Sequence, residues 1–177
     1  MLPLAALALA VTLTAQDDST ALKPPALEKG DVIGLVAPAS PLAAEQARAA
    51  AENIRKRGYG VKLADERSVR RGYLAGSDEA RAAAVNALIR DPEVKAIVCL
   101  RGGYGSPRIL DRIDYDALRR QPKIVVGYSD ITALLIAIHR RTGLVTFHGP
   151  MGKEWSALKG LTPYSEKYFW DALTSPE

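Results

Sequence analysis

Short apolar runs alternate with longer amphipathic segments along most of the chain. Two of the runs, residues 96–100 and 124–127, are apolar at every position, which is typical of strands buried on both faces of a parallel sheet. The predicted strands are residues 32–37, 61–64, 96–100, 124–127 and 144–147.

The segments between these strands have the character of helices. They lie at residues 42–57, 77–90, 109–119 and 130–141, and the third has a break near Asp114. Ser77 followed by two acidic residues is typical of a helix start, because the serine caps free amides and the acids favour the helix dipole. Strands and helices that alternate at this spacing predict βαβ units. We therefore expect an α/β fold with a mainly parallel sheet and helices on both faces.

The first residues differ from the rest of the chain. Residues 2–15 are apolar apart from two threonines. This run is shorter than the roughly 20 residues of a membrane-spanning helix and has the length of a signal peptide's apolar core. We predict a signal peptide at residues 1–16, with cleavage after Ala15, then a leader at 17–26, and no stable membrane span. The alternative is an apolar extension from a misassigned start, which leaves the protein in the cytoplasm.

Charge and cysteine content limit the classes of function. The chain has 24 Lys and Arg against 20 Asp and Glu, a net charge of +4, and the two signs are interspersed. No basic block is present to hold a phosphate backbone, so nucleic acid is not an expected partner. Cys99 is the only cysteine, which excludes an intramolecular disulfide and a cysteine-based metal cluster.

The pattern of alternating elements fills residues 27–152, which we assign to one α/β domain carrying the candidate nucleophile. After it, residues 153–177 are rich in aromatic side chains. We interpret this segment as a linker towards a missing C-terminal domain, and we expect the aromatic side chains to pack against that domain and to expose apolar surface in its absence. The aromatic residues are Trp155, Tyr164, Tyr168, Phe169 and Trp170.

Functional sites of open parallel sheets form beyond the carboxyl ends of the strands. Here those ends carry residues 38–40, 101–106, 128–130 and 148–150. Since parallel strands all end at the same side of the sheet, we expect these four segments to lie along one edge.

Ser129 is the sharpest candidate at this edge. It lies between a predicted strand and a predicted helix, as the serine of a nucleophile elbow does, and the first amides of the helix would favour a developing oxyanion. The pattern is incomplete, because Ile131 stands where the elbow motif G-x-S-x-G has its second glycine. The local sequence fits a simple helix cap equally well.

The loop at residues 101–105, with the sequence RGGYG, follows a buried strand. Its three glycines allow positive φ and a close approach of the backbone, so its N–H groups are candidates for an oxyanion hole beside Ser129. A phosphate-binding loop is a weaker interpretation, because the spacing of such motifs is absent. A plain tight turn is the remaining alternative.

A nucleophilic serine needs a base, and the chain has two histidines. His139 is ten residues along the helix from Ser129, about 15 Å away, and cannot reach it. His148 follows a strand that runs parallel to the strand of Ser129 and is therefore the only internal candidate. The favoured alternative for His148 is a hydrogen-bonded structural histidine that braces the turn at Gly149 and Pro150.

Five segments in this order resemble the N-terminal domain of the LD-carboxypeptidases, serine peptidases that include murein tetrapeptide carboxypeptidases and microcin C immunity peptidases. The resemblance covers about residues 27–155, and five motifs in register are specific where one alone is weak. The segments are residues 38–41 (PASP), 72–78 (GYLAGSD), 101–105 (RGGYG), 127–130 (GYSD) and 147–151 (FHGPM). The fold that this resemblance implies is flavodoxin-like or class I glutamine amidotransferase-like.

The resemblance implies that Ser129 is the nucleophile and that the amides of Asp130 and Gly103 form the oxyanion hole. It implies a Ser-Glu-His triad whose Glu and His come from a C-terminal domain, which demotes His148, and no metal or organic cofactor. The implied substrate is a peptide with an L-centre linked to a C-terminal D-residue, such as the D-alanine of a murein tetrapeptide. The predicted signal peptide adds the expectation of export to the bacterial periplasm. The residues that we expect to contact the substrate or support the site are Arg101, Gly102, Tyr104, Tyr128, His148 and Ser40.

Three hypotheses follow for the chain as given. The first is a nucleophile-bearing half of an LD-carboxypeptidase, inactive alone. For the full-length form of such an enzyme, a homodimer is also considered. The second is a free-standing hydrolase that uses Ser129 and His148. The third is a non-catalytic module that binds muropeptides at the same edge.

Overall fold

The computed structural model describes residues 21–64, 70–156 and 160–175. The predicted signal peptide, its cleavage point and the first residues of the leader lie outside this part of the chain. Within it, no helix is both long enough and apolar enough to cross a membrane.

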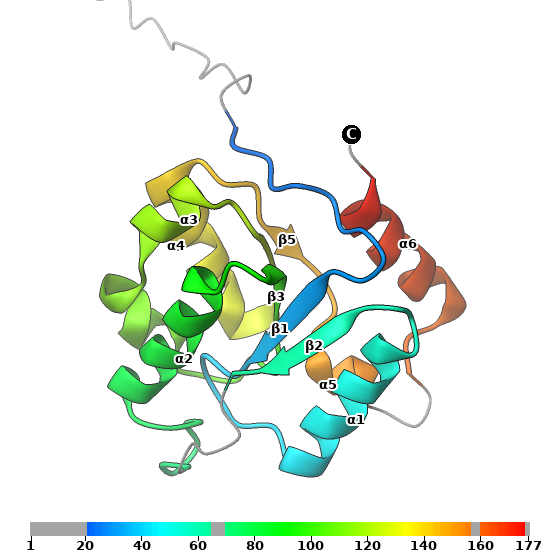
Figure 1. Ribbon diagram of the computed structural model, residues 1–177. Coiled ribbons are helices and arrows are strands. Elements are labelled where there is room, and N and C mark those ends of the chain that lie inside the picture. Colours follow the sequence, from blue (N-terminus) through cyan, green and yellow to red (C-terminus); the bar gives the residue numbers. More distant parts are fainter. Residues whose placement is uncertain (1–20, 65–69, 157–159, 176–177) are drawn as a thin grey trace, which may run out of the picture.

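A sheet of five parallel strands lies at the centre of the molecule (Figure 1). The strand order is β2-β1-β3-β4-β5. This confirms the α/β prediction with a parallel sheet. The strands are β1 (Val32–Val36), β2 (Gly60–Leu63), β3 (Val94–Cys99), β4 (Ile124–Gly127) and β5 (Phe147–His148).

Helices cover both faces of the sheet (Figure 1). One face is covered by α2, α3 and α4, and the other by α1, α5 and α6. In β3 the side chains of Ala96 and Val98 belong to one core, and those of Ile97 and Cys99 to the other. This alternation explains why residues 96–99 of the strand are all apolar; Lys95, near its start, is exposed. The helices are α1 (Ala44–Arg55), α2 (Asp78–Arg90), α3 (Tyr115–Arg120), α4 (Thr132–Thr142), α5 (Gly152–Trp155) and α6 (Pro163–Thr174), with 3-10 turns η2 (Ser106–Arg112) and η3 (Ser129–Ile131).

The local helix signals are confirmed. Ser77 caps α2 by accepting a hydrogen bond from the amide of Ala80. The predicted break near Asp114 separates η2 from α3, because the Asp114 carboxylate accepts from the amide of Ala117 and starts a new helix.

The fifth strand differs from its prediction. We expected residues 144–147, but β5 contains only Phe147 and His148. Leu144 instead forms a parallel bridge with Leu22 of the leader, whose N–H and C=O bond to Gly143 and Val145. A partner that is more than a hundred residues away in sequence leaves no signal in the local pattern.

The aromatic residues after the sheet are divided between core and surface. Trp155 and Phe169 are 2% and 8% exposed, and their rings pack edge-on at 5.1 Å against each other. The prediction that these two pack against a further domain is therefore wrong, because α5 and α6 fold back onto the sheet of this domain. Tyr164 and Tyr168 are exposed, as expected for apolar surface in this segment.

Lys123 is buried at the amino end of β4, at the opposite edge of the sheet from the candidate site. Its side chain is 1% exposed, and its Nζ donates to the carbonyl oxygens of Asp91 and of Val94, the latter at 2.7 Å. Desolvation of the ammonium lowers the pKa of Lys123 from 10.5 to about 8.

This burial predicts a pH dependence of stability. Below about pH 8 Lys123 is protonated in both the folded and the unfolded chain. Between about pH 8 and 10.5 it is protonated mainly in the unfolded chain, which therefore binds more protons. The free energy of unfolding of the wild type, measured relative to Lys123→Met, should therefore rise with pH across this window, by up to about 3 kcal/mol. Denaturant unfolding of both proteins on either side of the window checks this. A difference that stays constant or falls contradicts it.

Candidate functional site

The four segments after β1, β3, β4 and β5 lie side by side at one edge of the sheet. The amide of Ser40 donates to the carbonyl of Gly102 at 3.2 Å, which joins the first two segments. The amide of Gly149 donates to the carbonyl of Gly127 at 3.0 Å, which joins the last two. The middle pair is joined at Ser129, as described below.

Ser129 has a strained backbone and a free side chain. Its φ is +60°, and it is the only non-glycine residue in the described part of the chain with a positive φ. Such a conformation costs on the order of 1–3 kcal/mol and persists only where the surroundings impose it. The side chain is exposed and caps neither η3 nor α4. The helix-cap interpretation is therefore wrong, and the hydroxyl is presented to solvent.

The residues that flank Ser129 explain the departure from the elbow motif. A Cβ on Gly127 would lie 2.5 Å from Cγ2 of Ile131, so only glycine fits there. Ile131 is fully buried. The isoleucine thus fills the space over the first glycine of the motif, and the turn needs no second glycine.

The RGGYG loop approaches Ser129 through a position that has no side chain. A Cβ on Gly102 would lie 3.1 Å from Cβ and 3.3 Å from Oγ of Ser129. The Gly102 carbonyl accepts from Ser40, and in a trans peptide the following N–H points the opposite way. The N–H of Gly103 is therefore turned away from Ser40, and no described residue accepts a hydrogen bond from it.

The amide of Asp130 is the second free donor, since no described residue accepts from it either. It follows Ser129 directly in the chain. Two unpaired N–H groups beside an exposed hydroxyl are able to stabilise the oxyanion of an acyl-transfer reaction.

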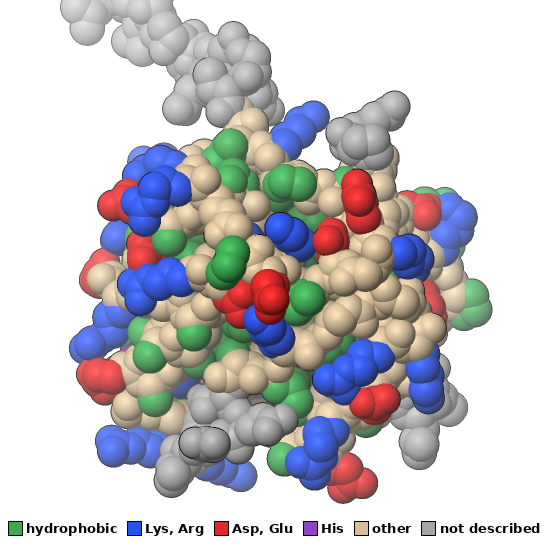
Figure 2. All heavy atoms as spheres, viewed as in Figure 1, with side chains coloured by type: hydrophobic (Ala, Val, Ile, Leu, Met, Phe, Trp, Pro, Cys, Tyr) green, Lys and Arg blue, Asp and Glu red, His purple; other side chains and the backbone are tan. Residues whose placement is uncertain are grey.

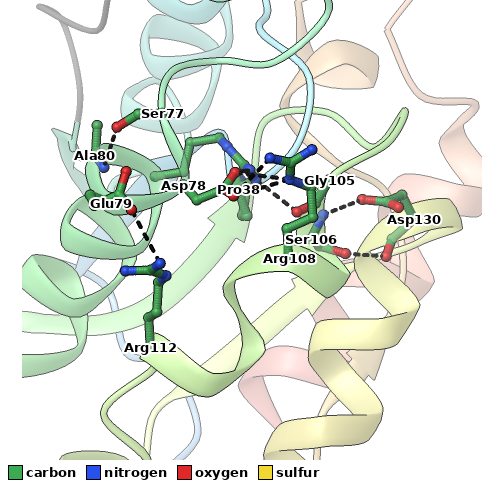
Figure 3. A network of polar contacts seen from close by, with 11 residues as sticks. Pro38, Ser77, Asp78, Glu79, Ala80, Gly105, Ser106, Arg108, Arg112 and Asp130 are labelled. Atoms are coloured by element: carbon green, nitrogen blue, oxygen red, sulfur yellow. Dashed lines mark hydrogen bonds and ion pairs between the residues drawn. The ribbon is translucent and has the colours of Figure 1, made fainter.

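The side chain of Asp130 ties this turn to the RGGYG loop (Figure 3). Its carboxylate accepts from the amide of Ser106 at 2.8 Å, and the hydroxyl of Ser106 donates to the Asp130 carbonyl. On the other side of the loop, the buried Arg81 of α2 donates to the carbonyls of Gly105 and Pro38. Arg81 was not among the site residues predicted from the sequence. The available signal was a charged residue four positions before Val85 on the apolar face of a helix.

His148 lies next to the strand of Ser129. It is opposite Gly127 in the β4–β5 ladder, and its ring centroid lies 6.1 Å from that of Tyr128. The ring is exposed and has no hydrogen-bond partner among the described residues, which contradicts the interpretation of His148 as a hydrogen-bonded brace. No hydrogen bond joins it to Ser129.

Tyr128 is held by the start of α5. Its hydroxyl donates to Glu154 at 2.8 Å, and the same carboxylate accepts from the amide of Met151 at 2.9 Å. The Lys153 ammonium lies 5.0 Å from the Tyr128 ring centroid. Its contact with the Tyr128 hydroxyl, with a further contribution from Glu154, raises the pKa of Lys153. These contacts fix the residue that precedes the candidate nucleophile.

A cavity of about 650 Å³ lies beside the loop, between the ends of β1 and β3 and the start of α1. Its lining contains Ser40 and three arginines, Arg48, Arg70 and Arg101, and no acidic side chain among the described residues. Elsewhere, as on the face seen in Figure 2, cationic and anionic side chains are interspersed. The described residues contain no cluster of three metal-ligating side chains.

Tyr104 of the loop forms an exposed aromatic pair with Tyr73. Their ring centroids lie 5.7 Å apart, edge to face, and each side chain is more than half exposed. The edge therefore combines a free hydroxyl, two free amides, a cationic cavity and an exposed aromatic surface.

Comparison with known proteins shows which proteins this chain is similar to. A family model described as the LD-carboxypeptidase N-terminal domain matches residues 33–149. A Bacillus subtilis (strain 168) protein named "Probable murein peptide carboxypeptidase" is 50% identical over 129 residues, which is 73% of this chain and 40% of that protein. The murein tetrapeptide carboxypeptidase of Pseudomonas aeruginosa is 35% identical over 134 residues, which is 75% of this chain and 42% of that protein.

Solved structures agree with the sequence matches. A MccF-like protein from Bacillus anthracis superposes with a TM-score of 0.81 at 37% identity, covering 88% of this chain and 48% of that one. A muramoyltetrapeptide carboxypeptidase from Oxalobacter formigenes gives 0.75 at 29% identity, covering 82% and 48%. The chain thus spans less than half the length of these relatives.

The strain at Ser129 predicts an unusual order of stabilities. Ser129→Gly and Ser129→Ala both remove the hydroxyl, but only alanine keeps a Cβ at positive φ. We expect the glycine variant to be more stable than the alanine variant by about 1 kcal/mol, the reverse of the usual order. Denaturant unfolding of the two variants measures this. An alanine variant of equal or greater stability would show that the left-handed turn is not retained.

Proposed function

Because the chain belongs to the LD-carboxypeptidase family, as its N-terminal domain, we propose that it is the nucleophile-bearing half of a serine peptidase. The proposed substrate is a murein tetrapeptide, from which the enzyme releases the C-terminal D-amino acid, such as D-alanine. The observation that carries the proposal is Ser129 itself. Its backbone is strained, its exposed side chain caps no helix, and it lies beside the free amides of Gly103 and Asp130.

In the proposed reaction the Ser129 Oγ gives up its proton to a base and attacks the carbonyl carbon of the bond between the L-centre and the D-residue. The carbonyl oxygen becomes an oxyanion and is stabilised by the N–H groups of Gly103 and Asp130. The C–N bond then breaks, the base returns its proton to the leaving amine, and an acyl-serine remains. Water activated by the same base hydrolyses the ester and restores the hydroxyl.

The base is proposed to be a Glu–His pair from a C-terminal domain. Among the described residues no histidine is hydrogen-bonded to Ser129, and the relatives are more than twice as long as the segments they share with this chain. The proposal therefore assigns the nucleophile and the oxyanion hole to this half, and the base to the other.

Arg101 is proposed to bind the substrate's terminal carboxylate. A carboxypeptidase must recognise this group, and a guanidinium binds it through two parallel hydrogen bonds. Arg101 is exposed, immediately precedes the glycines of the loop and lines the cationic cavity. Ser40 and Tyr104 are proposed to contact the rest of the peptide, and Gly102 and Tyr128 to support the turn at Ser129.

A second candidate is hydrolysis with His148 as the base. It is favoured by the pairing of β5 with β4, which places His148 one strand away from the nucleophile strand. Export to the bacterial periplasm, where murein peptides occur, also remains a proposal, and it depends on the apolar segment at residues 1–16.

The first test is hydrolysis of a murein tetrapeptide, followed by D-alanine release. We expect no release by the 177-residue chain alone and release once it is joined to a C-terminal half of the length seen in the relatives. In the joined form, Ser129→Ala should lower kcat at least about a thousandfold, as loss of a covalent nucleophile does. Activity that survives this change would contradict the proposal. Turnover by the chain alone that is abolished by His148→Ala would support the second candidate.

The second test concerns Arg101. Arg101→Gln should raise KM about ten- to a hundredfold, because a charge-assisted hydrogen bond contributes about 1.5–3 kcal/mol. Arg140→Gln, an exposed arginine at the far end of α4, is the matched control and should leave KM unchanged. An unchanged KM in Arg101→Gln would exclude Arg101 from carboxylate binding.

A further inference from the structure

We propose that Arg81 is a positioning residue for catalysis. Its buried guanidinium anchors the loop at residues 101–106, here called the oxyanion loop, and so fixes the amide of Gly103. The inference rests on the proposed function, because it concerns how that oxyanion hole is held in place.

Arg81 joins two segments of the candidate site, the one after β1 and the one after β3, from the interior of the domain. Its side chain is 0% exposed, and Nη1 donates to the carbonyl of Gly105 at 2.9 Å and to that of Pro38. Its Nη2 pairs with Asp78, one turn earlier on α2. Figure 3 labels Pro38, Asp78 and Gly105, the three residues whose oxygens accept these bonds. One rigid fork thus connects the carboxyl end of β1 with the oxyanion loop.

The oxyanion loop needs an external anchor because it has few side chains to hold it. Gly103 and Gly105 have φ values of +109° and +125°, and glycine leaves such a backbone with many accessible conformations. A Cβ on Gly105 would lie 2.5 Å from Cδ2 of Leu74 and 3.1 Å from Nη1 of Arg81, so the loop packs directly against the guanidinium. An apolar side chain would fill this space but remove a donor from both carbonyl groups, leaving that of Gly105 with only the amide of Arg108.

A second link places the anchored loop relative to the nucleophile. Ser106, the residue after Gly105, bonds through its amide and its hydroxyl to Asp130. The two proposed oxyanion donors, the amides of Gly103 and Asp130, therefore belong to one connected network. Arg81 holds one side of this network and Asp130 the other.

Asp78 completes the anchor by balancing charge. Its carboxylate pairs with Arg81. It also accepts bonds of 2.9 to 3.1 Å from the guanidinium of Arg108. Arg108 and then Arg81 lower the pKa of Asp78, although burial opposes them. The buried cation thus keeps its counter-charge at neutral pH, and the fork keeps its orientation.

Hydrogen exchange of the 177-residue chain tests the anchor without requiring activity. We expect the hydrogen-bonded amide of Ser106, at the end of the oxyanion loop, to exchange about tenfold faster or more in Arg81→Met than in the wild type, with the amides of β1, β3 and β4 unchanged. Arg81→Lys, which keeps the charge but loses the fork, should be intermediate. The matched control is Arg112→Met, which removes an exposed arginine paired with Glu79 in the same region and should leave the loop unchanged.

The catalytic consequence is measured in the form that hydrolyses the tetrapeptide. Arg81→Met should lower kcat about ten- to a hundredfold and leave KM within about twofold, because the oxyanion exists only in the transition state. Arg81→Lys should restore part of kcat.

Several results would overturn the inference. They are unchanged exchange in the loop, exchange that rises equally in the loop and the strands, or a KM effect with an unchanged kcat. If Arg81→Met does not fold, Arg81→Lys decides by the same criteria. Absence of hydrolysis by the wild type would contradict the proposed function instead, and the exchange result would still decide the anchor.

Discussion

The chain passes from β4 into a helical turn within a single residue, and only a left-handed backbone at Ser129 allows this. The conformation is unfavourable by on the order of 1–3 kcal/mol, so neighbouring contacts must impose it. Ile131 packs over Gly127 on one side of the turn, Glu154 holds Tyr128 before it, and Ser106 holds Asp130 after it. The exposed hydroxyl and the free amide of Asp130 both follow from this one constraint.

The sheet supplies the rigidity on which the turn depends. Its central strands contribute alternate side chains to two separate cores, so neither face moves without disturbing a packed layer. Because the strands are parallel and adjacent, the segments that follow β1, β3 and β4 are brought together with little freedom. The glycine-rich loop is the exception, and its buried arginine and Asp130 contacts compensate for its lack of side chains.

Local chemistry made much of this predictable from the sequence. The all-apolar strand at 124–127, the Ser77 cap and the break at Asp114 all depend on neighbouring residues, and all are found. The β5 boundary and the burial of Trp155 depend on contacts with distant segments, and there the predictions were wrong. At the site, the motifs indicated Ser129 and its loop, but the side-chain network around Arg81 depends on three elements that only the fold brings together.

The central claim is that Ser129 is a nucleophile facing an oxyanion hole formed by Gly103 and Asp130. The most direct measurement is a crystal structure of the hydrolytically active form with a peptide boronic acid in place of the scissile carbonyl. We predict boron bonded to the Ser129 Oγ, with one boronate oxygen about 2.7–3.1 Å from both amide nitrogens. Boron bonded to another residue, or a boronate whose oxygens contact neither amide, would contradict the account.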